Sequence, residues 1–303
     1  MIRRFLYMVD LCGDNSLTQR LRRIDTSRLF YPKDQLPRAS PSSSSAAAAV
    51  EDARLPPAAM GFSASMNFMR TSDDKIVTVD DTGRRAILYD PAAHTVRSLP
   101  PMASPKFLTV SLAVAGDLYV MVTPPHPDKV GGGEGRRPEY SFEALVHRER
   151  RSGWMTNADE EARHWRPMPP PPFVHDAAAG EIHGYAAIGD SHILPRAPAA
   201  SVQSKGFSVA SPGEWKGLAA PREVASHVVH LGGGKLCVAK VFWVVRRGTC
   251  SYPCCVGEHD KVKFAMLTGV EVVPGGGHGG KPRIVKHKSC RYRFGQYHPT
   301  HVL

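Results

Sequence analysis

The chain has 303 residues, 42% hydrophobic and 22% charged, which is enough for a buried core in one large domain or two small ones. Its 39 Lys and Arg residues outnumber 28 Asp and Glu residues, but they are dispersed, so we interpret the net charge of +11 as loop and tail charge. Six Cys in a chain of this length exclude a secreted disulfide scaffold, and no apolar run approaches the ~20 residues that cross a bilayer. We therefore expect a protein of the cytoplasm or nucleus with no membrane segment.

The N-terminal part of the chain predicts a hairpin followed by a linker. Apolar residues favour strands over 4–10 and 21–30, with turn residues at 13–16 between them. We expect this hairpin, residues 1–32, to be part of the same fold as the rest. Residues 33–49 are rich in Pro, Ser and Ala and cannot bury enough apolar surface to become ordered, so they predict a disordered linker.

Residues 50–303 predict one repeat domain of short strands. Strands are expected at 75–80, 86–90, 95–99, 108–114, 118–122, 141–146, 181–188, 191–193, 224–230, 235–245, 264–273 and 282–294. The polar stretch 154–165 is expected to contain a short helical turn. Closely spaced strands without amphipathic helices between them indicate an all-β fold, because a parallel α/β sheet would need crossover helices.

One unit of sequence recurs in this domain. It has a strand ending in a turn, a short strand, a Leu/Met-Pro-Pro element, an apolar strand, a Gly-containing corner and a further strand. The copies cover 88–120, 142–193 and, in degraded form, 207–238, with corners at Gly116-Asp117, Gly189-Asp190 and Gly232-Gly233. A four-stranded sheet cannot hide both its faces alone, whereas sheets stacked around an axis protect one another. The repeat therefore predicts the blades of a propeller.

The first copy is similar to a kelch repeat. The similarity lies in Tyr89-Asp90-Pro91, Leu99-Pro100, Met102 and residues 116–119 (GDLY), although Val120-Met121 replace the Gly-Gly pair of kelch. The resemblance implies a protein-binding propeller face. The expected fold is thus an all-β, kelch-like β-propeller with antiparallel four-stranded blades, incomplete or irregular, because three recognisable units are few for a closed ring.

Eight further segments resemble a plant family expanded in grasses and catalogued as domain of unknown function sixteen-sixty-eight. They are 27–32 (SRLFYP), 50–57 (VEDARLPP), 102–107 (MASPKF), 142–145 (FEAL), 231–240 (LGGGKLCVAK), 250–253 (CSYP), 267–271 (LTGVE) and 285–289 (VKHKS). The resemblance extends over nearly the whole chain, and it implies a fold but no activity, cofactor or catalytic residue. Between about 193 and 206 the chain departs from the family, and a missing blade segment is expected there.

The densest group of possible metal ligands is Cys250, Cys254, Cys255 and His259. Structural zinc sites usually take their ligands from two paired knuckles, and a second Cys pair is missing here. His278, His287 or Cys290 could complete a site only through folding. We interpret the group as a reduced cysteine-rich loop and predict no metal.

No sequence pattern indicates an enzyme. Histidines are scattered over predicted strands and loops, at His164, His175, His183, His192, His227 and His230, and neither a Gly-x-Ser-x-Gly elbow nor a His-Glu-x-x-His helix is present. The Gly-rich stretches 131–135 and 275–280 are not followed by the Gly-Lys-Ser/Thr of a phosphate loop. We predict no catalytic and no cofactor-binding residues.

Three functions remain open. The leading hypothesis is an interaction module that holds an unidentified protein partner through propeller loops. The second is nucleic-acid binding through the basic stretch from Lys281 to Arg293, interleaved with Tyr292 and Phe294, although the same alternation describes a strand with one solvated face, which we favour. The third is an enzyme on a propeller scaffold, which would need carboxylates or metal ligands gathered in an axial channel.

Overall fold

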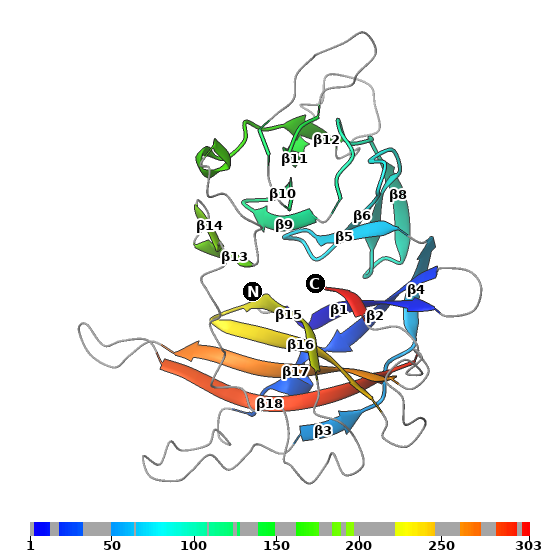
Figure 1. Ribbon diagram of the computed structural model, residues 1–303, viewed down its shortest axis with the longest axis vertical. Coiled ribbons are helices and arrows are strands. Elements are labelled where there is room, and N and C mark those ends of the chain that lie inside the picture. The colour runs from blue at the N-terminus through cyan, green and yellow to red at the C-terminus, as the bar shows by residue number, and fades with distance from the viewer. Residues whose placement is uncertain are drawn as a thin grey trace. The chain divides into compact units, whose positions relative to one another are not determined.

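The computed structural model describes a chain built from strands (Figure 1). The described residues are 3–12, 18–32, 50–63, 65–107, 109–123, 126–127, 139–148, 162–175, 184–188, 192–196, 222–245, 261–273, 283–295 and 299–303. The chain divides into two compact units, one comprising Met1–Ala64 with Ser204–Leu303 and the other Ser65–Gln203. The predicted linker at 33–49 lies outside the described residues. The predicted division into a hairpin (1–32), a linker (33–49) and a repeat domain (50–303) therefore remains a prediction.

The first unit begins with a sheet that contains both ends of the described chain. Its strands are β1 (Phe5–Cys12), β2 (Thr18–Asp25), β4 (Ala58–Ser63) and β19 (Pro299–Val302), in the order β19-β1-β2-β4. The C-terminal strand runs antiparallel to β1, with Met8 opposite Val302. Tyr7 and Leu303 exchange backbone hydrogen bonds of 3.0 and 2.8 Å. The sheet is therefore completed by residues from the far end of the sequence.

The second sheet of this unit has five strands. Four of them form an antiparallel meander: β15 (Arg222–Gly232), β16 (Lys235–Val245), β17 (Lys261–Val273) and β18 (Arg283–Phe294). A short strand, β3 (Val50–Ala53), adds to β18 in parallel. The β15–β16 turn needs glycine, because Gly232, Gly233 and Gly234 all have positive φ and a Cβ on Gly234 would lie 2.8 Å from the Val272 carbonyl oxygen.

A single apolar core joins these two sheets. Alternate residues of β16 point into it, as the two-residue period of a strand requires. The fully or nearly buried members are Leu6, Met8, Ile24, Leu29, Val229, Leu231, Cys237, Ala239, Val241, Ala265, Leu267, Cys290, Tyr292, Phe294 and Val302. The terminal strands thus share a core with the long meander.

The second unit contains two four-stranded meanders and a hairpin. Strands β5 (Met66–Arg70), β6 (Ile76–Asp80), β7 (Ala86–Asp90) and β8 (Thr95–Leu99) form one sheet, and β9 (Thr109–Val114), β10 (Asp117–Val122), β11 (Phe142–Arg148) and β12 (Ala162–Pro167) form the next. Strands β13 (Gly184–Ile188) and β14 (His192–Arg196) pair with each other. Val77, Leu88, Met102, Leu118 and Leu145 lie in the core that the two meanders share.

The predicted all-β class with antiparallel four-stranded sheets is confirmed. The first repeat copy starts in β7 and β8 of one sheet and continues into β9 and β10 of the next. Its corner is a tight hairpin in which Ala115 and Gly116 both have positive φ and Asp117 pairs with Val114. The corner at Gly189-Asp190 lies outside the described residues.

One local prediction is wrong, and a second is tested only at its end. The strand predicted over 21–30 ends at Asp25, whose carboxylate accepts the Ser27 N–H at 2.9 Å and so starts the 3-10 turn η1 (Thr26–Leu29). The helical turn predicted in 154–165 is not found in its described part, because residues from Ala162 onward form β12 beside β11. Residues 151–161 lie outside the described part of the chain.

Candidate functional site

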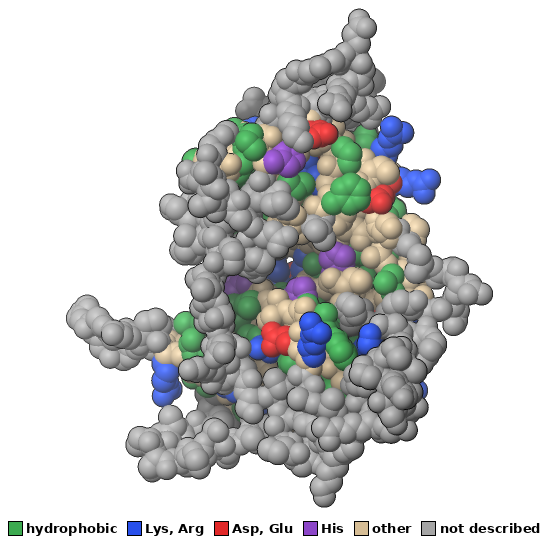
Figure 2. All heavy atoms as spheres, in the orientation of Figure 1, with side chains coloured by type: hydrophobic (Ala, Val, Ile, Leu, Met, Phe, Trp, Pro, Cys, Tyr) green, Lys and Arg blue, Asp and Glu red, His purple; other side chains and the backbone are tan. Residues whose placement is uncertain are grey.

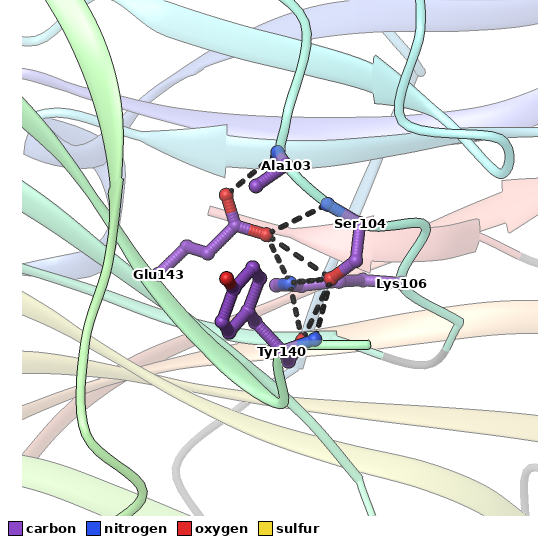
Figure 3. Close-up of polar contacts among 5 residues, drawn as sticks. All are labelled: Ala103, Ser104, Lys106, Tyr140 and Glu143. Atoms are coloured by element: carbon purple, nitrogen blue, oxygen red, sulfur yellow. Dashed lines mark hydrogen bonds and ion pairs between the residues drawn. The ribbon is translucent and has the colours of Figure 1, made fainter. Parts of the chain in front are cut away.

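A buried polar network fastens the connection between β8 and β9 to strand β11. The connection runs through residues 101–107, and Met102 anchors it by burying its side chain and donating its N–H to the Gly83 carbonyl at 2.8 Å. From there the chain passes the start of β11, where Glu143 is buried. Its carboxylate faces Ala103, Ser104 and Lys106 of the loop (Figure 3). Lys106 of the loop and Glu143 of β11 therefore meet inside the second unit.

The centre of the network is an ion pair between Lys106 and Glu143, with Nζ and Oε1 2.5 Å apart (Figure 3). Lys106 Nζ also donates to the Tyr140 carbonyl at 2.8 Å and to Ser104 Oγ at 3.1 Å. Glu143 accepts the backbone N–H groups of Ala103 at 2.9 Å and Ser104 at 3.2 Å. Ser104 Oγ in turn accepts the Tyr140 N–H at 3.0 Å.

This network acts as a clamp rather than as a reactive centre. The side chains of Lys106 and Glu143 are 1% and 0% exposed, so a solvent-borne substrate does not reach them. The three ammonium hydrogens of Lys106 are matched by three oxygen acceptors, which is what makes a buried charge tolerable. The arrangement fixes the path of the loop against β11.

The residue after the clamp has the opposite environment. Phe107 is 65% exposed, although its neighbour Lys106 is almost completely buried. Single exposed apolar side chains are ordinary on protein surfaces, but Phe107 is the aromatic one among the large apolar side chains described as exposed, and the clamp fixes the loop that carries it. Phe107 is therefore the described residue with the clearest features of a contact point.

The clamp joins two of the segments that carry the family resemblance. Lys106 belongs to 102–107 and Glu143 to 142–145, so the two segments meet in space through one ion pair. Sequence reasoning singled out both segments but did not predict their contact. An acid and a base 37 residues apart in the chain give no sequence signal that they pair.

Four other segments of the resemblance meet around His287. The Tyr31 N–H donates to His287 Nδ1 at 3.2 Å, so Nε2 carries the proton and donates to Glu271 Oε2 at 3.0 Å. Phe30 packs edge-on against the imidazole, with ring centroids 4.9 Å apart, and Lys235 lies over Phe30. Burial lowers the pKa of His287, although the hydrogen bond to Glu271 opposes this. Because both ring nitrogens are used, His287 holds residues 27–32 onto the sheet.

A third contact fastens β3 to β18. Arg291 donates to both carboxylate oxygens of Asp52, at 2.5 and 2.7 Å, and Arg28 lies 3.3 Å from Glu51. The hydrogen bond from Arg291 is the main cause of the lowered pKa of Asp52. Asp52 belongs to the segment 50–57, so this segment too is involved in a structural contact.

The candidate zinc ligands are not brought together in the described part of the chain. Cys250, Cys254, Cys255 and His259, together with His278, lie outside it. Cys290 is a free, buried thiol, and burial raises the pKa of Cys237 on the same face to about 12 and that of Cys290 as well. Such thiols are poor nucleophiles and poor metal ligands. Among the described residues no group of three or more His, Cys, Asp or Glu is placed to hold a metal ion.

The remaining predicted positions are scattered. His164 lies on β12, His175 ends the 3-10 turn η3 (Pro172–His175), His192 starts β14, and His227 and His230 lie on β15. His183 and the Gly-rich stretches 131–135 and 275–280 lie outside the described residues. Apart from His227 and His230, which share β15, these predicted histidines lie on different elements.

The basic C-terminal stretch is a strand, as favoured from the sequence. Tyr292 and Phe294 of β18 are buried in the core, so their rings are not offered for stacking on bases. Lys281 lies outside the described residues. Figure 2 shows the described Lys and Arg side chains of one face as separate points, some beside acidic side chains, rather than as one basic patch.

Among the described residues no helix is both long enough and apolar enough to cross a bilayer.

Comparison with known proteins assigns the chain to a family. A comparison with curated proteins gave no match. Residues 3–199 and 195–292 match the family described as Protein of unknown function (DUF1668), and the two matched stretches meet within the region around 193–206 where the sequence is expected to depart from the family. Since these matches span most of the sequence, the chain belongs to the DUF1668 family.

Proposed function

We propose that this protein is an interaction module of the cytoplasm or nucleus that binds a protein partner and catalyses no reaction. The binding loops connect the strands of its antiparallel sheets, which are arranged as an irregular kelch-like propeller. Residues 101–107 form one such loop, and Phe107 is its anchor.

The observation that carries the proposal is the contrast between Lys106 and Phe107. Replacing a buried ion pair by apolar side chains is often neutral or stabilising, so stability alone does not explain the clamp. A clamped loop has already lost the conformational freedom that a flexible loop would lose on binding. Exposed aromatic side chains are common binding hot spots. The clamped loop and its exposed aromatic ring both fit a preorganised contact with another protein.

The nucleic-acid alternative has less support from the described residues. The rings that would stack on bases, Tyr292 and Phe294, are in the core, and Arg291 is bound to Asp52. Partner binding through loops therefore remains the function that the geometry supports best.

The test is a quantitative capture of partners from an extract of the source organism, with the wild-type chain and the Phe107→Ser variant as baits. A partner enriched by the wild type is then purified and its Kd measured by calorimetry. We expect Phe107→Ser to weaken binding about 30-fold, the effect of losing a hot spot of about 2 kcal/mol.

The matched control is Val96→Ser on β8, another exposed apolar residue of the same unit. This variant should change the Kd by less than about 3-fold. Equal affinity of the wild type and Phe107→Ser for every captured protein would refute the role of this loop.

A further inference from the structure

The loop at 101–107 has its polar side chains buried and its apolar side chains in water. Its buried side contains Ser104 and Lys106, which point toward Glu143 and Tyr140 (Figure 3). Its exposed residues alternate with the buried ones and are all apolar, and we call them the apolar ridge: Pro101, Ala103, Pro105 and Phe107. This distribution is the reverse of what solvation alone favours in a loop.

The apolar ridge is held in place from its buried side. The ring of Pro101 and that of Pro105 fix the backbone φ at two of its four positions. Asn67 Nδ2 donates to the Lys106 carbonyl at 3.4 Å, in addition to the contacts of the clamp. Turning the ridge inward would break the ion pair of Lys106 with Glu143, so burial of its apolar side chains requires another molecule.

Two cations lie beside the ridge. The β6–β7 turn packs against the loop, because a Cβ added to Gly83 would lie 3.1 Å from the Ser104 carbonyl oxygen and 3.4 Å from Pro105 Cα. The next two residues of this turn are Arg84 and Arg85, and both are exposed. Their side chains therefore start within a few residues of the closest contact between turn and loop.

The carboxylates of the same turn do not cancel this charge at the outer surface. Asp80 Oδ1 accepts the backbone N–H groups of Arg84 at 2.9 Å and Arg85 at 3.2 Å, and both its oxygens lie 3.0 Å from the Thr82 hydroxyl. Asp80 and Asp81 are half-buried, whereas the two arginines are exposed. The clamp beneath the loop pairs one cation with one anion. The charge presented to a partner beside the ridge is therefore positive.

We propose that the apolar ridge and these two arginines bind an acidic amphipathic segment of the protein partner. Its apolar face covers Phe107 and the prolines, and carboxylates at the border of that face pair with Arg84 and Arg85. The ridge spans no more than about 20 Å, a length that a helix of about 13 residues covers. Apolar burial supplies the affinity, and the charges mainly speed association and exclude basic partners. This inference rests on the proposed function and specifies its partner.

The experiment selects a phage-displayed library of random 16-residue peptides on the full chain. Selected peptides are synthesised with a fluorescein label, and their Kd is measured by fluorescence polarisation. We expect peptides that are enriched in Asp and Glu beside large apolar residues and that bind Phe107→Ser about 30-fold more weakly. The double variant Arg84→Gln, Arg85→Gln should weaken the same peptides at least about 10-fold, and higher salt should also weaken their binding to the wild type.

The charge-matched control is the double variant Arg54→Gln, Arg283→Gln, which removes two exposed arginines of the other unit. It should bind the peptides within about 2-fold of the wild type. Peptides that need Phe107 but are not acidic, or that bind the Arg84→Gln, Arg85→Gln variant as tightly as the wild type, would overturn this inference and leave the role of the loop intact.

Two further outcomes also decide against the acidic segment. If no selected peptide depends on Phe107, the inference is overturned, and the capture experiment with the Phe107→Ser bait decides separately whether the proposed function fails with it. If a single-stranded oligonucleotide binds more tightly than the peptides and loses affinity in the Arg84→Gln, Arg85→Gln variant, the arginines serve nucleic acid instead.

Discussion

At the residue scale, the most consequential contact is the ion pair between Lys106 and Glu143. Removing one partner leaves the other charge buried without compensation, so Lys106→Met should lower the free energy of unfolding by about 3–5 kcal/mol. Adding Glu143→Gln should recover part of this loss, because it removes the buried charge, although its single amide oxygen can accept only one of the two backbone N–H groups that now bind different carboxylate oxygens. Urea denaturation measures both values.

An exposed ion pair provides the comparison for that prediction. Arg28 and Glu51 are each 53% exposed, so Arg28→Ala should cost less than about 1 kcal/mol. If Lys106→Met had an effect as small as Arg28→Ala, the clamp would not hold the loop.

Histidine burial predicts how stability depends on pH. Burial lowers the pKa of His301 to about 4, and it also lowers the pKa of His227 and His287. Between about pH 6.5 and 4 the unfolded chain therefore binds more protons than the folded chain, so stability is complete above 6.5 and decreases as the pH falls through this range. For His301 alone the loss is on the order of 3 kcal/mol at pH 4.

Thermal unfolding of the chain between pH 8 and pH 4 tests this dependence. The Tm should fall on acidification, and His301→Gln should flatten the curve. The control His94→Gln changes an exposed turn residue in the other unit and should leave the curve unchanged. A Tm that rises as the pH falls from 6.5 would contradict the assignment.

At the scale of elements, the close approach of η1 to β17 depends on one glycine. A Cβ on Gly269 would lie 2.3 Å from the Leu29 carbonyl oxygen, so Gly269→Ala must displace either the 3-10 turn or the strand. We expect a loss of about 1–3 kcal/mol, typical of overpacking, measured as a shift of the urea midpoint.

The matched variant is Gly61→Ala on β4. There the nearest atom to the added Cβ would be Thr18 Cγ2 at 3.5 Å, an ordinary contact. This variant should be close to neutral. If both alanine variants behaved alike, close packing would not be the reason for Gly269.

The strands show how much of the fold could be predicted from the sequence. Strands β7, β8 and β16 were found at or near their predicted limits. In β7 and β16 a buried face supports the pattern, whereas β8 is mostly exposed and was predicted from its short apolar-polar run between turn residues. Strand β3 was missed, since Val50–Ala53 is a polar stretch that becomes a strand only by adding to β18 through Asp52 and Arg291. Strand β19 was missed because four residues are too few to show the apolar-polar alternation that indicates a strand.

The candidate sites, like the strands, could be predicted only in part. The sequence indicated the segments around Lys106, Glu143 and His287 through the family resemblance. It could not indicate that these residues are buried and paired, because such pairing depends on contacts between strands distant in the chain. The exposure of Phe107 was not predicted either, since an aromatic residue at the end of a motif is more often part of the core.

At the scale of the whole molecule, the first unit depends on β19. Val302 is part of the core, and residues 299–303 supply one edge of the first sheet. Deleting 299–303, or the single change Val302→Asp, should destabilise this unit and speed its cleavage in limited proteolysis. Thr300→Ser, which keeps the hydroxyl bound to Val9 and lies outside the core cluster, should be tolerated. Cleavage equally slow in the deletion variant would show that β19 contributes nothing.

The pairing of β1 with β19 also determines when the protein can finish folding during synthesis. Val9 and Thr300 are hydrogen-bonded across a separation of 291 residues, so β1 emerges from the ribosome long before its partner exists. At about 5–20 residues per second this interval is roughly 15–60 s. The unit formed by Ser65–Gln203 is continuous and can assemble meanwhile. The nascent N-terminal hairpin therefore keeps the β1 edge unpaired with β19 throughout this interval.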